Sequence, residues 1–93
     1  MAATVKVRLP TPLRRLAQGK DVVEVTAATL AECLSTLDSN YAGMKDRLCD
    51  EKGEMRPFVN IYINGEDVRF LKGLATPLKQ GDEISIVPAV AGG

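Results

Sequence analysis

The chain has 93 residues, of which 45% are hydrophobic and 26% are charged, and twelve basic residues balance twelve acidic ones. This length indicates one domain with one modest core. A formal net charge of zero provides no bulk field that would attract nucleic acid or anionic lipid. The sequence lacks histidine, the commonest general base and zinc ligand, and its two cysteines are too few for a four-ligand structural zinc site.

The sequence also argues against a membrane or secreted protein. No apolar run approaches the roughly 20 residues that a helix needs to cross a bilayer. The first ten residues, MAATVKVRLP, lack the long apolar stretch of a secretory signal. We therefore expect a cytoplasmic protein that binds neither membranes nor nucleic acid.

The first 25 residues predict two strands. Thr4–Leu9 alternates apolar and polar residues, which is typical of a half-buried strand. The short β-branched run Val22–Val25 predicts a hairpin partner for it. Two prolines and a glycine interrupt the segment between them, which predicts a loop with room for one short helical turn.

One long helix is predicted next. Thr29 is followed three residues later by Glu32, which is a capping-box pattern. We expect Gly43 to end the helix. Apolar residues at spacings of three and four form one face of it: Leu30, Cys33, Leu34, Leu37 and Tyr41.

The second half of the sequence predicts a short helical turn, a surface loop and three strands. Phe58–Ile63 is the strongest strand signal, and Asn64 and Gly65 after it favour a tight hairpin turn. We expect Glu66–Phe70 to return as a short strand and Glu83–Val87 to form the last strand. Between them, Leu74 and Leu78 are candidate core residues, and Gly81 and Asp82 a turn.

This element order predicts an α+β fold of the ubiquitin-like β-grasp type. One amphipathic helix packs across one face of a mixed sheet, and the last strand lies centrally beside the first. We expect residues 1–88 to form this domain. We expect the last five residues to form a flexible C-terminal segment, which consists of Ala89, Val90, Ala91, Gly92 and Gly93.

The small residues of the C-terminal segment point to a chemical role. Such a chain can enter a narrow channel, and without a Cβ at Gly92 or Gly93 an enzyme can approach the terminal carbonyl closely. The Gly93 carboxylate is ionised at neutral pH and is a poor electrophile, so it would need activation as an acyl-adenylate. Attack by a sulfur nucleophile would then leave a thiocarboxylate. The sequence has no GxGxxG or Walker pattern, so we expect ATP to bind a partner enzyme.

The motifs VNIYIN, EDVRF, GLATPL and GDEISIVPAVAGG resemble the ThiS/MoaD family of sulfur-carrier proteins over essentially the whole chain. The resemblance is closest to the CysO type, the carriers of thiocarboxylate-dependent cysteine biosynthesis. It implies adenylation of Gly93 by an E1-like adenylyltransferase/sulfurtransferase and a thiocarboxylate as the covalent modification. It also implies delivery of sulfur to a PLP-dependent cysteine synthase and later release of cysteine by a metalloprotease. Gly92 and Gly93 are the residues that match the family's functional motif.

One face of the predicted sheet is a candidate docking surface. If Val59, Ile61 and Ile63 face the helix, the alternate residues of that strand lie on the open face. We define the docking patch as Phe58, Asn60, Tyr62, Arg8 and Val87. The alternative is that Phe58 and Tyr62 only pair across strands.

Four other features have structural readings that we prefer to functional ones. Arg14 and Arg15 are interpreted as solvated loop charges, and Glu66–Arg69 as hairpin hydrogen bonding. Gly81–Glu83 is interpreted as a turn and not as a metal site. For the cysteines, we expect Cys33 in the core and Cys49 as an ordinary loop thiol, with a part for Cys49 in sulfur exchange left open.

Three other functions remain open from the sequence. The chain could be the small subunit of molybdopterin synthase or a carrier for another sulfur-containing metabolite. It could be a ubiquitin-like modifier in which Gly93 forms isopeptide bonds with lysines of other proteins. It could also be an interaction module whose terminal glycines are incidental.

Overall fold

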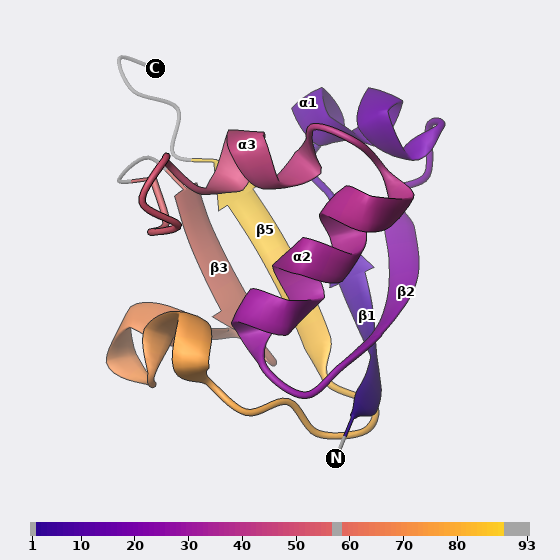
Figure 1. The fold of residues 1–93 in the computed structure, drawn as a ribbon. Coiled ribbons are helices and arrows are strands. Elements are labelled where there is room, and N and C mark those ends of the chain that lie inside the picture. The colour runs from indigo at the N-terminus through magenta and orange to yellow at the C-terminus, as the bar shows by residue number, and fades with distance from the viewer. Residues whose placement is uncertain (1, 57–58, 89–93) are drawn as a thin grey trace.

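A mixed sheet crossed by one main helix makes up the molecule (Figure 1). The computed structural model describes residues 2–56 and 59–88. The strands are β1 (Ala3–Arg8), β2 (Val22–Ala27), β3 (Val59–Ile63), β4 (Glu66–Asp67) and β5 (Glu83–Pro88). The α-helices are α1 (Thr11–Arg14), α2 (Leu30–Asn40) and α3 (Met44–Leu48), and the 3-10 turns are η1 (Arg15–Ala17), η2 (Val68–Phe70) and η3 (Gly73–Ala75).

The last strand lies in the middle of the sheet, as predicted. The strand order is β2-β1-β5-β3-β4. β5 runs parallel to β1 and antiparallel to β3, and β1 and β2 form an antiparallel hairpin. This arrangement confirms the predicted β-grasp topology.

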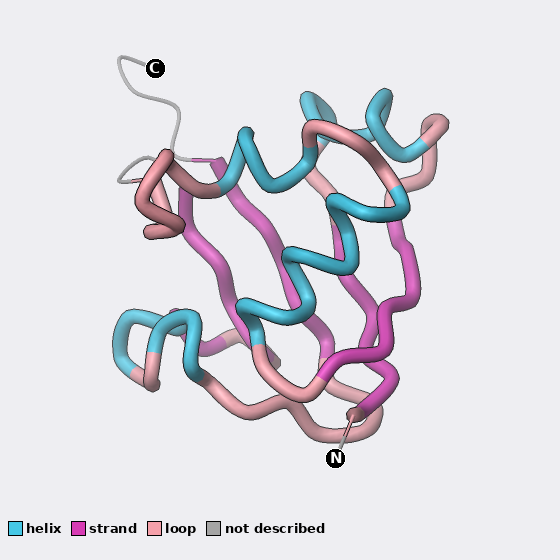
Figure 2. The backbone as a smooth tube through the Cα atoms, in the orientation of Figure 1, coloured by secondary structure: helices cyan, strands magenta, loops and turns pink. Residues whose placement is uncertain are grey.

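Helix α2 lies across one face of the sheet, and Figure 2 shows the helix in front of the strands. Its predicted face is confirmed, because Leu30, Cys33, Leu34 and Leu37 are buried and Tyr41 packs partly buried against the core. From the sheet, inward residues such as Val5, Val7, Ile61 and Ile84 complete the core. The opposite face of the sheet carries the alternate residues, most of which are polar, and is called the open face below.

The N-terminus of α2 follows from local sequence. Oγ1 of Thr29 accepts a hydrogen bond from the backbone N–H of Glu32 at 3.3 Å, and Oε1 of Glu32 accepts from the N–H of Ala28 at 3.3 Å. The predicted N-terminal cap is therefore confirmed. The prediction that Gly43 ends the helix is wrong, because α2 ends at Asn40 and the extended Tyr41 is its C-cap. Gly43 instead precedes α3 with a φ of 92°, in the left-handed region that glycine tolerates best.

The predicted strand Glu66–Phe70 is wrong beyond Asp67. Oδ1 of Asp67 accepts a hydrogen bond from the backbone N–H of Arg69 at 2.9 Å, which favours a turn over a continued ladder. Val68 at the same point is buried in the core. The chain therefore leaves the sheet after two residues and forms η2.

The expectation that Cys49 is an ordinary loop thiol is also wrong. Cys49 follows α3 and is buried, because its backbone forms an isolated bridge with Met55 that folds the following loop back over it. Asp50 tightens that loop by accepting hydrogen bonds from the N–H groups of Lys52 and Glu54 at 2.9 and 3.1 Å.

Candidate functional site

The described chain ends at Pro88, the last residue of β5. Pro88 lies opposite Val59, and Val87 lies opposite Asn60. The residue that precedes the C-terminal segment is therefore held by pairing with β3. Residues 89–93, including Gly92 and Gly93, lie outside the described residues, and their role stays a prediction.

Four of the five docking-patch residues lie on the open face. On β3, Val59, Ile61 and Ile63 are buried toward α2, whereas Asn60 and Tyr62 are partly exposed on the other side. Two further members of the patch come from neighbouring strands: Arg8 is exposed on β1, and Val87 on β5 is 44% exposed. Phe58, the fifth member, lies outside the described residues.

The strand register brings these four residues together. Arg8 and Tyr62 both lie opposite Ser85, one from each side of β5. Asn60 lies opposite Val87 and so flanks the end of β5. Neighbouring strands are about 4.8 Å apart, so the patch spans about 10 Å across β1, β5 and β3. It combines an apolar side chain, an aromatic ring, an amide and a guanidinium, which together suit a protein partner.

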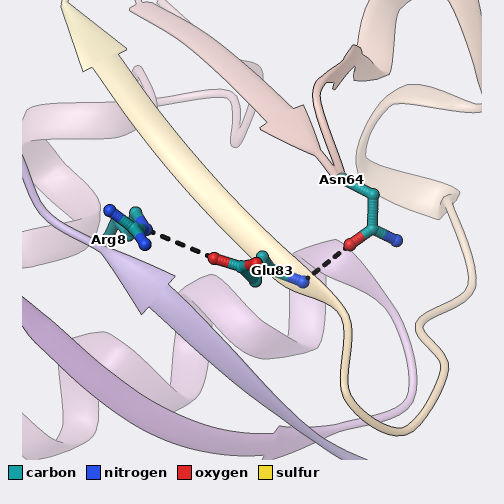
Figure 3. Close-up of polar contacts among 3 residues, drawn as sticks. All are labelled: Arg8, Asn64 and Glu83. Carbon is teal, nitrogen blue, oxygen red and sulfur yellow. Dashed lines mark hydrogen bonds and ion pairs between the residues drawn. The ribbon is translucent and has the colours of Figure 1, made fainter.

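A polar network borders the patch (Figure 3). Nε of Arg8 lies 3.3 Å from Oε1 of Glu83, and the two side chains are 64% and 54% exposed. The backbone N–H of Glu83 donates to Oδ1 of Asn64 at 3.0 Å. An exposed ion pair of this kind adds little to stability, so Arg8 can exchange Glu83 for an acidic partner at small cost.

A wide hollow of about 470 Å³ lies on the same face, lined by Lys6, Arg8, Val22, Gly81 and Glu83. Lys6 and Arg8 alternate with the buried Val5 and Val7 along β1, so both cationic side chains project from the open face. The hollow widens the surface that a partner can contact.

The predicted turn at Gly81–Glu83 is confirmed. Oδ2 of Asp82 accepts from the N–H of Lys79 at 2.8 Å, and Oδ1 accepts from Nδ2 of Asn64 at 2.9 Å, so this carboxylate organises a turn. The interpretation of Arg14 as a solvated loop charge is wrong, because Arg14 lies in α1, is partly buried and donates from Nε to the carbonyl of Leu9 at 3.2 Å. Arg15 is exposed, as expected. Within residues 2–56 and 59–88, no three metal-ligating side chains come together. No helix in those same ranges is long and apolar enough to cross a membrane.

Neither cysteine is placed for thiolate chemistry. Burial raises the pKa of Cys33 from 9.0 to about 12. Burial also raises the pKa of Cys49, with Asp50 acting in the same direction and Lys45 and Arg56 opposing it. Because the thiolate is the reactive form, both groups are poor nucleophiles at neutral pH in the folded state. The geometry gives no support to sulfur exchange at Cys49.

One contact on the open face could not be foreseen from the sequence. Nη1 of Arg69 donates to Oδ1 of Asn60, and Nη2 donates to the carbonyl of Val59, both at 2.8 Å. The sequence predicted only local hydrogen bonds within the hairpin for Glu66–Arg69, and it did not predict these two bonds to β3. They arise because η2 turns the chain back toward β3, and no periodicity in the sequence signals that turn.

The topology and the open face define a protein of the ubiquitin-like β-grasp class. The model of the ThiS family matches residues 7–93, and the chain belongs to this family.

Comparisons with individual proteins agree with the family. The chain is 47% identical over 91 residues to the sulfur carrier protein CysO of Mycobacterium tuberculosis, covering 96% of this chain and 98% of that protein. It is 36% identical to a putative sulfur carrier protein of Archaeoglobus fulgidus over 96% of this chain and 98% of that one.

A solved structure gives the same result. A chain in the crystal structure of the Amycolatopsis orientalis BexX/CysO complex superimposes with a TM-score of 0.90 at 45% identity, covering 96% of this chain and 99% of that one.

Proposed function

We propose that the protein is a sulfur carrier whose Gly93 carboxylate becomes a thiocarboxylate, and that it serves cysteine biosynthesis. The observation that carries this proposal is the 47% identity to the sulfur carrier protein CysO, which extends over 98% of that protein. The family match continues to Gly93, so the residues proposed to react lie within the matched region.

The proposed chemistry has two steps. The Gly93 carboxylate attacks the α-phosphorus of ATP in an E1-like adenylyltransferase, which forms the acyl-adenylate and releases pyrophosphate. Hydrosulfide, or an equivalent sulfur nucleophile from the sulfurtransferase activity, then attacks the acyl carbon. AMP leaves with the bonding electrons, a proton is released, and the thiocarboxylate remains. The carrier supplies the acyl group, and the partner supplies the ATP site and the catalytic groups.

A partner must hold both the domain and the C-terminal segment. A five-residue segment reaches at most about 17 Å when extended, so an active site that takes Gly93 lies close to the end of β5. The four described residues of the docking patch lie on β1, β5 and β3 at or beside the segment from Ser85 to Val87 of β5. The structure of a BexX/CysO complex supports the idea that carriers of this kind present themselves to a folded partner.

We further propose a PLP-dependent cysteine synthase as the sulfur acceptor and a metalloprotease that releases the cysteine. The CysO relatives support this choice over molybdopterin synthase. We also propose a cytoplasmic location, where ATP for the adenylation is available.

Reconstitution tests the proposal. The purified chain is incubated with the host's E1-like enzyme, MgATP and sulfide, and its intact mass is measured. We expect the mass change of one sulfur replacing one oxygen, located by fragmentation to Gly93. A chain whose mass stays unchanged while the enzyme activates other carriers would contradict the proposal.

A second function is favoured by a separate observation. The chain is 44% identical over 66 residues to small archaeal modifier protein 3 of Haloferax volcanii, covering 71% of each chain. In this alternative, Gly93 forms isopeptide bonds to lysines of other proteins. Adducts of high mass in host extracts, lost on deletion of Gly92 and Gly93, would identify conjugation.

A further inference from the structure

The short strand β4 leaves part of β3 without a strand neighbour on that side. β4 pairs with β3 only at Tyr62 and Ile63. The side chain of Arg69 reaches back along β3 and binds the carbonyl of Val59 and Oδ1 of Asn60, each at 2.8 Å. A guanidinium therefore contacts β3 at the positions where β4 no longer pairs with it.

The direction of Arg69 is set by the turn that precedes it. Asp67 accepts a hydrogen bond from the N–H of Arg69 at 2.9 Å, and Val68 is fully buried. Together they fix the backbone at the base of the Arg69 side chain. The planar guanidinium then donates through two nitrogens in a fixed fork, which a lysine cannot reproduce.

This contact determines how Asn60 is oriented. A side-chain amide carries an acceptor oxygen on one side and two N–H donors on the other. Because Oδ1 of Asn60 accepts from Arg69, the two N–H donors point away from Arg69. Asn60 lies opposite Val87, one register position from the Val59–Pro88 pair that ends β5. The Asn60 side chain therefore lies beside the end of β5.

A donor at this point matters because Pro88 has no backbone N–H. A partner that holds residues 89–93 must cover this end of the sheet, and Asn60 offers it N–H groups there. An oxygen acceptor, either a backbone carbonyl or a carboxylate, is the group that such donors recognise.

We propose that Arg69 is a positioning residue that orients Asn60, so that the Asn60 amide donates a hydrogen bond to an oxygen of the activating enzyme where the C-terminal segment leaves the sheet. This inference rests on the proposed function, because it requires an enzyme that takes Gly93. It assigns recognition to Asn60 and orientation to Arg69.

The substitution Asn60→Asp separates recognition from folding. An aspartate still accepts the Arg69 hydrogen bond but has no N–H donors and repels an acceptor oxygen. With the host activating enzyme, we expect KM for the carrier to rise about tenfold with kcat unchanged, and the melting temperature not to fall. Thr26→Asp adds the same charge on the open face of the edge strand β2 and should leave KM unchanged.

Two substitutions at Arg69 test orientation. Arg69→Gln removes the forked donor and should raise KM about threefold to tenfold, while Arg69→Lys restores part of the loss. Adding Arg69→Gln to Asn60→Asp should cause little further change in KM, because both act through the same amide. A wild-type KM in Asn60→Asp, or full additivity of the two changes, would overturn the proposal.

Side-chain amide resonances give a readout that needs no partner. The sequence has three asparagines, Asn40, Asn60 and Asn64, so the pair that disappears in Asn60→Asp identifies Asn60. We expect this pair to shift in Arg69→Gln and to shift less in Arg69→Lys. If Arg69→Gln leaves it unmoved, the positioning role is wrong even if the wild-type chain is adenylated. Failure of the proposed function would instead appear as no adenylation of the wild-type chain.

Discussion

Asn64 and Glu83 bind each other twice. The N–H of Asn64 donates to the carbonyl of Glu83 at 2.8 Å, and the N–H of Glu83 donates to Oδ1 of Asn64 at 3.0 Å. Nδ2 of Asn64 also donates to Asp82 at 2.9 Å. One hairpin residue therefore fixes the start of β5, the strand that leads to the C-terminal segment.

Substitution of Asn64 should separate side-chain bonding from backbone strain. Asn64 has a φ of 54°, which glycine adopts freely and alanine does not. We expect Asn64→Gly to lower the free energy of unfolding by about 1–2 kcal/mol through the lost side-chain bonds. Asn64→Ala should lose about 1 kcal/mol more, from left-handed strain. Urea unfolding measures both, and equal stability of Asn64→Gly and wild type would contradict the contribution of these bonds.

Val87 should contribute to partner binding more than to folding. Val87 and Leu71 are 44% and 38% exposed, but only Val87 belongs to the docking patch. We expect Val87→Ala and Leu71→Ala each to change stability by less than about 1 kcal/mol. In adenylation kinetics, Val87→Ala should raise KM severalfold and Leu71→Ala should not. Equal KM values for the two variants would argue against the patch.

Cys33 should make stability depend on alkaline pH. Its pKa is 9.0 in the unfolded chain and about 12 when folded, so unfolding releases a proton between these values. Below pH 9 the protonated Cys33 contributes its full share to stability. Above pH 9 the free energy of unfolding falls by about 1.4 kcal/mol per pH unit, until the pH reaches the pKa of the folded state. Urea unfolding of wild type and Cys33→Ala should show a steeper alkaline decline for wild type. Parallel declines would contradict this, since both proteins share all lysines and tyrosines.

Cys49 should be dispensable for sulfur loading. It is buried and its pKa is raised, so its thiolate is scarce at neutral pH. We expect Cys49→Ala to form thiocarboxylate at the wild-type rate, at a cost of about 1 kcal/mol in stability from the lost packing. Loss of thiocarboxylate in a variant that remains folded would instead identify Cys49 as a sulfur-exchange residue.

Local patterns predicted most of the fold. The alternation in β1, β3 and β5 and the spacing of three and four in α2 each follow from the burial of one face. The central place of β5 follows from the same patterns combined with the single long helix. Asn64 and Gly65 were sufficient to predict the hairpin, because both adopt positive φ.

Other features depended on contacts that no local pattern encodes. β4 is short because Val68 turns into the core and Asp67 caps the turn. Cys49 is buried because its bridge to Met55 folds the loop over it. The contact of Arg69 with Asn60 joins residues nine positions apart through that unforeseen turn. Each therefore required the tertiary structure.

We also expect the domain to fold without the C-terminal glycines. In the described residues, β5 reaches Pro88, which pairs with Val59, so the described sheet forms from residues that precede Gly92 and Gly93. We expect deletion of both glycines to shift the melting temperature by less than about 2 °C, equivalent to a few tenths of a kcal/mol. Thermal unfolding of the two proteins measures this, and a large loss of stability would mean that the terminus is part of the fold.

Top-down mass spectrometry of the protein isolated from its own host tests the carrier role most directly. We predict that a fraction of the chains carries one sulfur in place of one oxygen, that fragmentation places it at Gly93, and that chains lacking Gly92 and Gly93 never acquire it. A sulfur located on any other residue, or a terminus that remains an ordinary carboxylate under sulfur-replete growth with the activating enzyme present, would contradict the account.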